Sequence, residues 1–276
     1  MFQFYMPTKV IIGRECVVKE GHLLKGIGNK ALIVTGRYSA KKNGALEDVI
    51  KALEEQNMAY CVFDEVEENP SLETVEKAKN FGVAQGVDFV IGIGGGSPID
   101  ASKAIAVMLK HPELTGSTLI GGSLSSVPVI AVPTTAGTGT EVTQYAIVTD
   151  HQAKTKKNIG HTVFPQIAFV DAYYMKDMPK TITIHTAVDA MSHLVESYLS
   201  VKSNAVSEGF VVEGLKEWGK CIPQLLAGEF TLEGRECLMM ASMLAGMAIA
   251  QTGTSLPHGM GLSLIHISEP TRPLYI

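Results

Sequence analysis

The sequence predicts an α/β fold with a parallel sheet, followed by an all-helical part. Two observations predict this fold class. Up to Asp171, short apolar runs alternate with stretches of helical spacing, and this alternation is typical of right-handed βαβ units. After Met178-Pro179, helical spacing continues and no strand pattern is evident. We therefore expect a Rossmann-like α/β N-terminal domain over residues 1–178 and an all-α C-terminal domain over residues 179–261.

Each strand is expected where a short apolar run, rich in β-branched residues, lies between turn residues. The expected strands cover residues 9–12, 31–35, 60–63, 89–93, 129–132, 146–149 and 167–171. Helices are expected where apolar residues recur every three or four positions, as Leu46, Val49 and Leu53 do in the stretch 43–56. The other expected helices cover residues 70–85, 97–109, 186–200, 204–221 and 232–251.

A glycine turn follows the expected strand at 89–93. The three residues Gly94–Gly96 allow the backbone to approach a ligand closely, and Ser97-Pro98 suits the N-cap and the first position of a helix. Such a helix start presents free N–H groups and a partial positive charge, which suits a cofactor phosphate. Asp100 and Lys103 follow closely enough to contact the same ligand. The alternative is a tight turn without a ligand, since the segment is neither a G-x-G-x-x-G fingerprint nor a P-loop.

A second polar segment follows the expected strand at 129–132. It runs from Pro133 to Thr143 and reads Pro-Thr-Thr-Ala-Gly-Thr-Gly-Thr-Glu-Val-Thr. Hydroxyls and glycines at the end of a strand suit contacts with phosphate and ribose. Because both polar segments follow buried strands, they would meet at the carboxyl edge of a parallel sheet, where nucleotides bind.

With these two segments, the chain resembles the iron-dependent (group III) alcohol dehydrogenases. The resemblance is carried by Gly-Gly-Gly-Ser-x-x-Asp-x-x-Lys at 94–103 and Pro-Thr-Thr-x-Gly-Thr-Gly-x-Glu-x-Thr at 133–143, and it extends from about Tyr5 to Gly261. It implies an active site in the cleft between two domains. It also implies reversible hydride transfer between a nicotinamide cofactor and a short primary alcohol or its aldehyde. The cofactor would be bound by Gly94, Gly95, Gly96, Ser97, Asp100, Thr134, Thr135, Thr138, Thr143 and Lys157.

The end of the expected strand at 31–35 bears on the choice between NAD(H) and NADP(H). A carboxylate there would hydrogen-bond an adenosine 2′-hydroxyl and repel a 2′-phosphate. The resemblance implies an aspartate at this place in NAD-using relatives, whereas this chain has Gly36 followed by Arg37, which could pair with a phosphate. NADP(H) is therefore favoured over NAD(H). The alternative is that Arg37 is a solvated loop charge.

Asp189 and His193 are four residues apart, so they would lie on one face of a helix. A carboxylate and an imidazole directed at one point suit a divalent metal, although an i,i+4 hydrogen bond or a core histidine would have the same spacing. Thr-x-x-Asp-x-x-x-His-x-x-Glu, which begins here at Thr186, is similar to the family's metal motif and implies that both residues are ligands. The resemblance further implies that His258 is a third ligand and a candidate proton relay. Iron(II) would be the usual metal, and zinc fits the same ligands.

The sequence departs from the family after Gly261, where a fourth histidine ligand and further helices would follow. Residues 262–276 resemble the translation of a sequencing-library adapter, so we expect a non-native tail and an incomplete helical domain. His266 is accordingly not proposed as a ligand. The alternative is a natural short variant with a divergent tail. The strongly apolar stretch Leu238–Ala250 needs packing partners, and we expect some of them among the missing helices. We therefore expect the 276-residue chain to aggregate or to have a loose C-terminal half.

Composition and charge limit the kinds of partner and the cellular compartment that we expect. The formal net charge of −5 argues against a nucleic-acid partner. Four widely spaced cysteines without Cys-x-x-Cys indicate a reducing compartment. The N-terminus has no signal pattern, and no apolar run is long enough to span a membrane. We therefore expect a cytoplasmic protein with no membrane partner, which at full length forms a homodimer or a larger homo-oligomer.

Three other functions stay open. A glycerol-type polyol dehydrogenase and a dehydroquinate-synthase-like lyase share the same superfold, but the hydroxyl-rich segment 133–143 favours the alcohol dehydrogenases. The third is an inactive cofactor-binding fragment, because this chain would lack a metal ligand and part of a domain.

Overall fold

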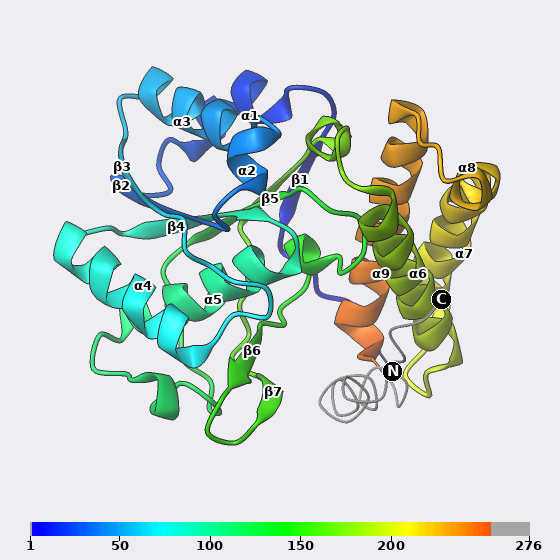
Figure 1. Cartoon of the computed structure of the whole chain (residues 1–276). Helices are drawn as coiled ribbons and strands as arrows, with labels where there is room; N and C mark the ends of the chain where they lie inside the picture. Colours follow the sequence, from blue (N-terminus) through cyan, green and yellow to red (C-terminus); the bar gives the residue numbers. More distant parts are fainter. Residues whose placement is uncertain (1, 255–276) are drawn as a thin grey trace, which may run out of the picture.

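The computed structural model of the chain describes residues 2–254. Its centre is a six-stranded sheet with the strand order β1-β8-β5-β4-β2-β3, and all of its neighbouring strands pair in parallel (Figure 1). The strands are β1 (Lys9–Ile12), β2 (Lys30–Thr35), β3 (Ala59–Phe63), β4 (Phe89–Gly94), β5 (Val129–Pro133) and β8 (Ile167–Val170). The predicted parallel sheet is therefore confirmed.

Helices cover both faces of the sheet, because its strands are apolar on both sides. One face carries α1 (Cys16–Lys19), the 3₁₀ helix η1 (Gly21–Leu24), α2 (Ser39–Lys42) and α3 (Ala45–Glu55). The other carries α4 (Leu72–Gln85), α5 (Gly96–Lys110) and the 3₁₀ helix η2 (Gly116–Thr118). Side chains alternate between the faces along β4, so Val90 belongs to the core under α4 and α5 and Ile91 to the core under α3.

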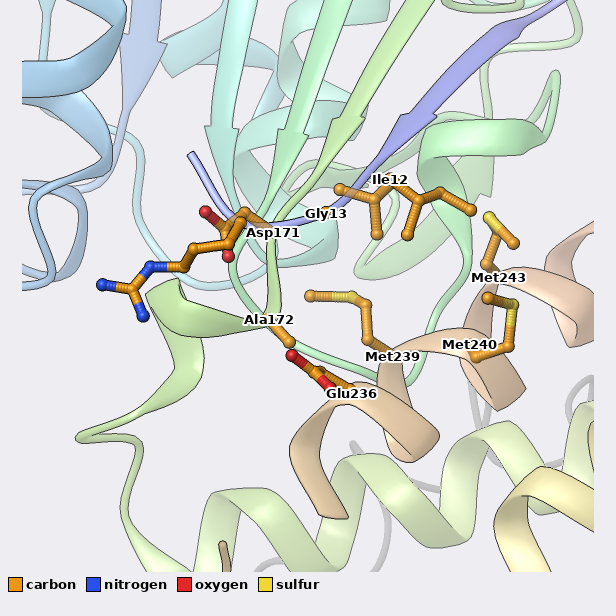
Figure 2. Close-up of a pocket in the computed structure, with 10 residues that line it drawn as sticks. Ile12, Gly13, Asp171, Ala172, Glu236, Met239, Met240 and Met243 are labelled. Carbon is orange, nitrogen blue, oxygen red and sulfur yellow. The ribbon is translucent and has the colours of Figure 1, made fainter. Parts of the chain in front are cut away.

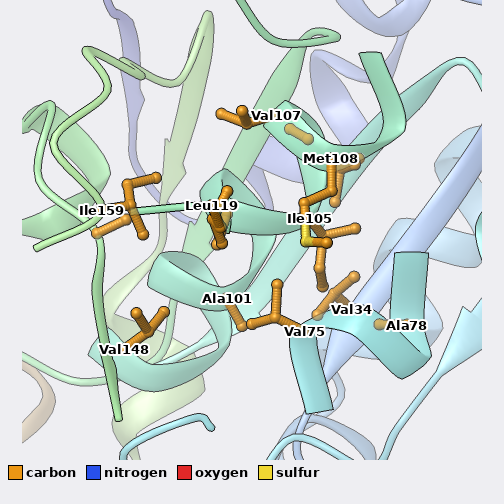
Figure 3. Packing of buried hydrophobic residues seen from close by; sticks show 14 of the residues in the cluster. Val34, Val75, Ala78, Ala101, Ile105, Val107, Met108, Leu119, Val148 and Ile159 are labelled. Carbon is orange, nitrogen blue, oxygen red and sulfur yellow. The ribbon is translucent and has the colours of Figure 1, made fainter. Parts of the chain in front are cut away.

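The core under α4 and α5 fixes where α5 begins. Val34 of β2, Val75 of α4 and Ile105 of α5 are fully buried in it (Figure 3). Gly92 of β4 lets α5 approach the sheet closely, because a Cβ atom there would lie 2.5 Å from the Ser102 hydroxyl oxygen. This close packing holds the first turn of α5 directly beyond the carboxyl end of β4.

A separate hairpin corrects one expected strand. The expected strand at 146–149 is β6 (Ile147–Asp150), but it pairs antiparallel with β7 (Thr155–Asn158) and lies apart from the parallel sheet. Strand β7 was not expected, because Thr-Lys-Lys-Asn has no apolar alternation. The hairpin projects beyond the sheet next to α5 (Figure 1).

The helical part begins at α6 (Lys180–Leu199), after the 3₁₀ helix η4 (Ala172–Met175). It continues through α7 (Ala205–Lys220), α8 (Ile222–Ala227) and α9 (Leu232–Thr252). Helix α9 is apolar around its whole circumference because it packs on α6 and α7 on one side and on η3 (Thr140–Val142) and η4 on the other. None of the described helices combines the length and the hydropathy that a bilayer-spanning segment requires.

The described part of the chain already supplies packing partners for α9. Leu238, Met243 and Ile249 are all at least nine-tenths buried. Several large apolar side chains of α6 and α7 stay exposed, among them Val195, Tyr198, Leu199 and Val212. The expected tendency to aggregate stays a prediction.

Candidate functional site

A cavity of about 610 Å³ lies at the carboxyl edge of the sheet, bounded by α5, the β6–β7 hairpin, α6 and the end of α9. Seven of the predicted site residues line it: Gly96, Ser97, Asp100, Thr138, Thr143, Asp189 and His193. The fold therefore brings the glycine turn, the hydroxyl-rich segment and the predicted metal pair to one place, although they are up to 97 positions apart in the sequence.

The first turn of α5 differs in detail from the prediction. Helix α5 begins at Gly96 with Gly95 as its N-cap, so Ser97 lies inside the first turn. The Ser97 hydroxyl accepts a hydrogen bond from the Asn69 backbone N–H at 3.0 Å. The predicted cap was two residues late, because the glycine backbone can already enter the helix. Gly96 and Ser97 still line the main cavity.

The glycines are required by the close approach of the hydroxyl-rich segment. A Cβ atom at Gly95 would lie 2.9 Å from the Thr135 hydroxyl oxygen, and one at Gly96 would lie 2.9 Å from Thr138 Cγ2. The Thr134 backbone N–H donates to the Gly94 carbonyl at 2.8 Å. Gly94, Gly95, Thr134 and Thr135 thus hold the two segments together, while the cavity itself is lined by Gly96 and Thr138.

Lys103 does not face the ligand cavity that the sequence suggested. Its side chain is fully buried, and its Nζ donates to the carbonyl oxygens of Thr140, Thr143 and Tyr145 at 2.8, 2.9 and 2.7 Å. Burial lowers the pKa of this ammonium to about 8. Lys103 therefore contacts the segment that lines the main cavity, and not the cavity itself.

Asp100 lines the cavity, but protein groups engage both of its oxygens. Its Oδ1 accepts from the Thr140 hydroxyl at 2.5 Å and its Oδ2 accepts from the Ile147 N–H at 3.0 Å. Burial raises the pKa of this carboxyl, and the nearby Lys103 opposes that rise. Asp100 therefore ties the hydroxyl-rich segment to the β6–β7 hairpin.

Asp189 and His193 project into the cavity from α6. The His193 ring is 5% exposed, and its Nδ1 lies 3.3 Å from the Gly137 carbonyl oxygen. A ring that donates from Nδ1 carries its lone pair on Nε2, which is the usual arrangement of a metal-binding histidine. An imidazole nitrogen with a carboxylate oxygen is a donor pair that suits iron(II) or zinc.

Asp189 and His193 alone are too few ligands for a metal site. Within residues 2–254, no group of three or more His, Cys, Asp and Glu side chains is placed to hold a metal ion. The predicted third ligand, His258, and the predicted tail at 262–276 lie outside the described residues. The donor types of Asp189 and His193 suit the predicted metal, and residues 2–254 place no complete set of ligands around them.

Gly36 and Arg37 lie away from the main cavity, at the carboxyl ends of β2 and β3. A second cavity of about 540 Å³ is lined there by Arg37, Tyr38, Phe63, Glu65, Val66, Glu67, Thr74 and Lys77. Gly36 packs closely, because a Cβ atom on it would lie 3.3 Å from the Val66 carbonyl oxygen. Arg37 is exposed and borders the cavity. The second cavity is thus a polar recess on the same edge of the sheet.

The hairpin shifts the predicted lysine contact by one residue. Lys157 pairs with Asp150 at 3.2 Å and does not line the main cavity, whereas Lys156 and Asn158 do. Alternate residues of a strand point to opposite faces, which explains the difference. Lys157 is therefore not positioned for the predicted contact.

Residues that the sequence analysis did not single out also line the main cavity. Tyr145 donates from its hydroxyl to the Ile249 carbonyl at 3.3 Å, and Ile147, Thr149 and Ile249 add apolar and hydroxyl surface. Tyr145 lies only two positions beyond the hydroxyl-rich motif, which is the one signal that could have identified it.

A further cavity of about 300 Å³ lies beyond β1 and β8, where Met239, Met240 and Met243 of α9 face Ile12 and Ala172 (Figure 2). Its buried carboxylate, Asp171, accepts backbone hydrogen bonds from Glu15 at 2.6 Å and Tyr173 at 2.9 Å. None of the predicted site residues lies in this cavity, so the candidate site is the main one.

Comparisons with known proteins identify the family of the chain. The family profile "Iron-containing alcohol dehydrogenase" matches residues 7–172, and the profile "Fe-containing alcohol dehydrogenase family, C-terminal" matches residues 183–265. The chain is 32% identical to the NAD-dependent methanol dehydrogenase of Bacillus methanolicus, over 94% of this chain and 69% of that protein. It is 29% identical to the NADPH-dependent butanol dehydrogenase of Clostridium saccharobutylicum, over 94% of this chain and 67% of that protein.

Solved structures agree as well. An iron-containing alcohol dehydrogenase from Thermotoga maritima superposes with a TM-score of 0.90 and 44% identity, over 96% of this chain and 73% of that one. An archaeal alcohol dehydrogenase from a Red Sea brine pool superposes with a TM-score of 0.90 and 28% identity, over 99% of this chain and 71% of that one. The resemblance inferred from the two motifs is confirmed, and the chain belongs to the iron-containing alcohol dehydrogenase family of oxidoreductases.

Proposed function

We propose that the chain catalyses reversible hydride transfer between NAD(P)(H) and a short primary alcohol or aldehyde. One observation carries this proposal: a single cavity is lined by the start of α5, by the hydroxyl-rich segment and by Asp189 and His193. Relatives named for methanol, butanol and 1,3-propanediol support the substrate class. The activity is a proposal because the chain spans only about two thirds of their length.

The cofactor would lie across the carboxyl edge of the sheet. We assign the pyrophosphate to the start of α5, a helix of 15 residues, because its N-terminal N–H groups and dipole favour an anion. Thr138, which packs against Gly96, and Thr143 offer hydroxyls for the ribose and phosphates from the lining of the same cavity. The adenosine end would extend toward Gly36 and Arg37, and there we propose a preference for NADP(H) over NAD(H).

Asp189 and His193 would hold the metal, with His258 as the proposed third ligand and a candidate for moving the proton. When bound, iron(II), or zinc in the same ligands, supplies a Lewis acid that polarises the substrate oxygen. The Gly137 carbonyl keeps the His193 ring in the tautomer that ligation needs. Ile147 and Ile249 give the cavity an apolar wall that suits an alkyl chain and excludes water.

We further propose that residues 1–178 form the cofactor domain and residues 179–261 form part of the metal-binding domain. The change of structure between η4 and α6 supports this division. A reducing cytoplasmic location and assembly into homodimers or larger homo-oligomers are also proposed. The four cysteines are free thiols in the structure, which is compatible with a reducing compartment.

The proposal is tested by turnover of the whole chain. The purified chain is supplied with Fe²⁺ or Zn²⁺, then mixed with NADPH and butanal, and the loss of NADPH absorbance is followed with and without a chelator. We expect metal-dependent NADPH oxidation with formation of butanol. NADPH binding without any turnover in either metal would instead identify an inactive cofactor-binding fragment.

A further inference from the structure

One segment, residues 137–145, contacts α5 on one side and the helices α6 and α9 on the other, and α6 carries the proposed metal ligands. On the helix side, the Gly137 carbonyl oxygen lies 3.3 Å from His193 Nδ1. Gln144 and Tyr145 donate from their side chains to the carbonyl oxygens of Ala250 and Ile249 at 3.1 and 3.3 Å. We call residues 137–145 the joint segment.

On the α5 side, two groups hold the joint segment: Asp100 accepts from the Thr140 hydroxyl at 2.5 Å, and Lys103 makes the larger number of contacts. Lys103 Nζ has four oxygen acceptors within 2.9 Å, namely the Thr140, Thr143 and Tyr145 carbonyls and the Thr140 hydroxyl. An ammonium has three N–H donors, so every donor of Lys103 is used within this segment. Its carboxylate neighbour, Asp100, is farther away at 3.9 Å.

The burial of Lys103 excludes a direct contact between its side chain and a cofactor or substrate in the main cavity. The side chain is fully buried and is not among the residues that line the main cavity. An apolar side chain of the same length would leave buried carbonyl groups of the joint segment without this donor, which the segment could correct only by moving. The position of the segment therefore depends on the Lys103 ammonium.

We propose that Lys103 is a positioning residue that sets the placement of the His193 ring and of the C-terminal end of α9 relative to the cofactor turn. It acts through the joint segment, from α5 on one side to α6 and α9 on the other. Because α5 also carries the glycine turn, one helix determines the placement of both the cofactor site and the metal pair. The consequence for catalysis rests on the proposed function, whereas the consequence for the joint segment does not.

The experiment compares the whole chain with Lys103→Met and with Lys110→Met, a matched control at the exposed end of the same helix. Amide hydrogen exchange is measured without ligands, and Zn²⁺ and NADPH affinities are measured by titration. For Lys103→Met we expect exchange about tenfold faster in residues 137–145 and at the end of α9, and Zn²⁺ affinity about tenfold weaker. The control should match the unsubstituted chain in all three measurements.

Two outcomes would overturn the proposal. Unchanged exchange with a loss of NADPH affinity alone would make Lys103 a cofactor contact, and unchanged exchange with unchanged affinities would give it no positioning role. Should Lys103→Met fail to fold, Lys103→Arg keeps donors but displaces the segment with a larger head group, and the same criteria apply to it. A chain that exchanges as expected but shows no turnover in any form would leave this inference standing and reject the proposed function.

Discussion

The His193 ring donates from Nδ1 toward the Gly137 carbonyl oxygen, 3.3 Å away. The two residues are 56 positions apart and belong to different parts of the fold, α6 and the turn that follows β5. Because a carbonyl oxygen can only accept a hydrogen bond, this contact favours a proton on Nδ1. Nε2 is then the ring nitrogen that suits the proposed metal.

The first prediction concerns His193 itself. We expect His193→Ala to lower metal-dependent aldehyde reduction by at least about 100-fold, because the cavity loses a proposed metal ligand. NADPH affinity, measured by fluorescence titration, should change little, since no cofactor contact is removed. The matched control is His185→Ala, an exposed histidine on the same helix, which should keep full activity. Equal activity of the two variants would remove His193 from the metal site.

The second prediction concerns the contact between Gly139 and α9. Gly139 has φ of +59°, and a Cβ atom on it would lie 2.6 Å from Gly246 Cα. We expect Gly139→Ala to lower the free energy of unfolding by about 2–3 kcal/mol. Gly209→Ala in α7 is the control, because nothing lies within 4 Å of its Cβ position, and it should stabilise the chain by about 0.5–1 kcal/mol.

Urea denaturation followed by circular dichroism would measure both glycine variants. If Gly139→Ala left the free energy of unfolding unchanged or raised it, as Gly209→Ala is expected to do, α9 could move away from the joint segment without cost. That result would also weaken the inference that the joint segment transmits the position of α5 to α9.

The third prediction concerns cofactor choice. A carboxylate in place of Gly36 would hydrogen-bond a 2′-hydroxyl and repel a 2′-phosphate. We expect Gly36→Asp to lower the ratio of kcat/KM for NADPH over NADH by at least about tenfold. Arg37→Gln should reduce kcat/KM for NADPH and leave that for NADH nearly unchanged. If neither variant changes the ratio, Arg37 is a solvated charge and this end of the sheet does not select the cofactor.

Local pattern predicted most of the fold, because buried parallel strands are apolar runs bounded by turn residues. Six of the seven expected strands belong to the sheet. The hairpin strand β7 was missed because its four polar residues, Thr155–Asn158, carry no periodic signal. Without this strand the sequence cannot show that Lys156 and not Lys157 lines the main cavity, since the facing side of a strand is unknown until its register is known.

The sequence analysis predicted which segments form the site, but it did not predict the hydrogen bonds that connect these segments. Both polar segments follow strands, so their meeting at the carboxyl edge follows from the parallel sheet. The role of Lys103 could not be predicted, because its acceptors are backbone carbonyls 37 to 42 residues away. Every residue has a backbone carbonyl, so residue types do not indicate which carbonyls accept from Lys103. Only the folded structure shows them.

The last prediction concerns Glu141, which is 2% exposed and whose Oε1 has no hydrogen-bond partner within the described part of the chain. Burial raises the pKa of this carboxyl from 4.5 to about 7. The folded chain therefore holds a proton that the unfolded chain releases above about pH 4.5, and the resulting stability is lost as the pH rises through 7. Relative to Glu141→Gln, the unsubstituted chain should lose on the order of 3 kcal/mol between pH 4.5 and 7.5. Urea titrations at several pH values across this range measure the difference in the free energy of unfolding, and the exposed Glu55→Gln is the control. If the free energy of unfolding changes with pH in parallel for the unsubstituted chain and Glu141→Gln, then Glu141 is ionised in the folded chain.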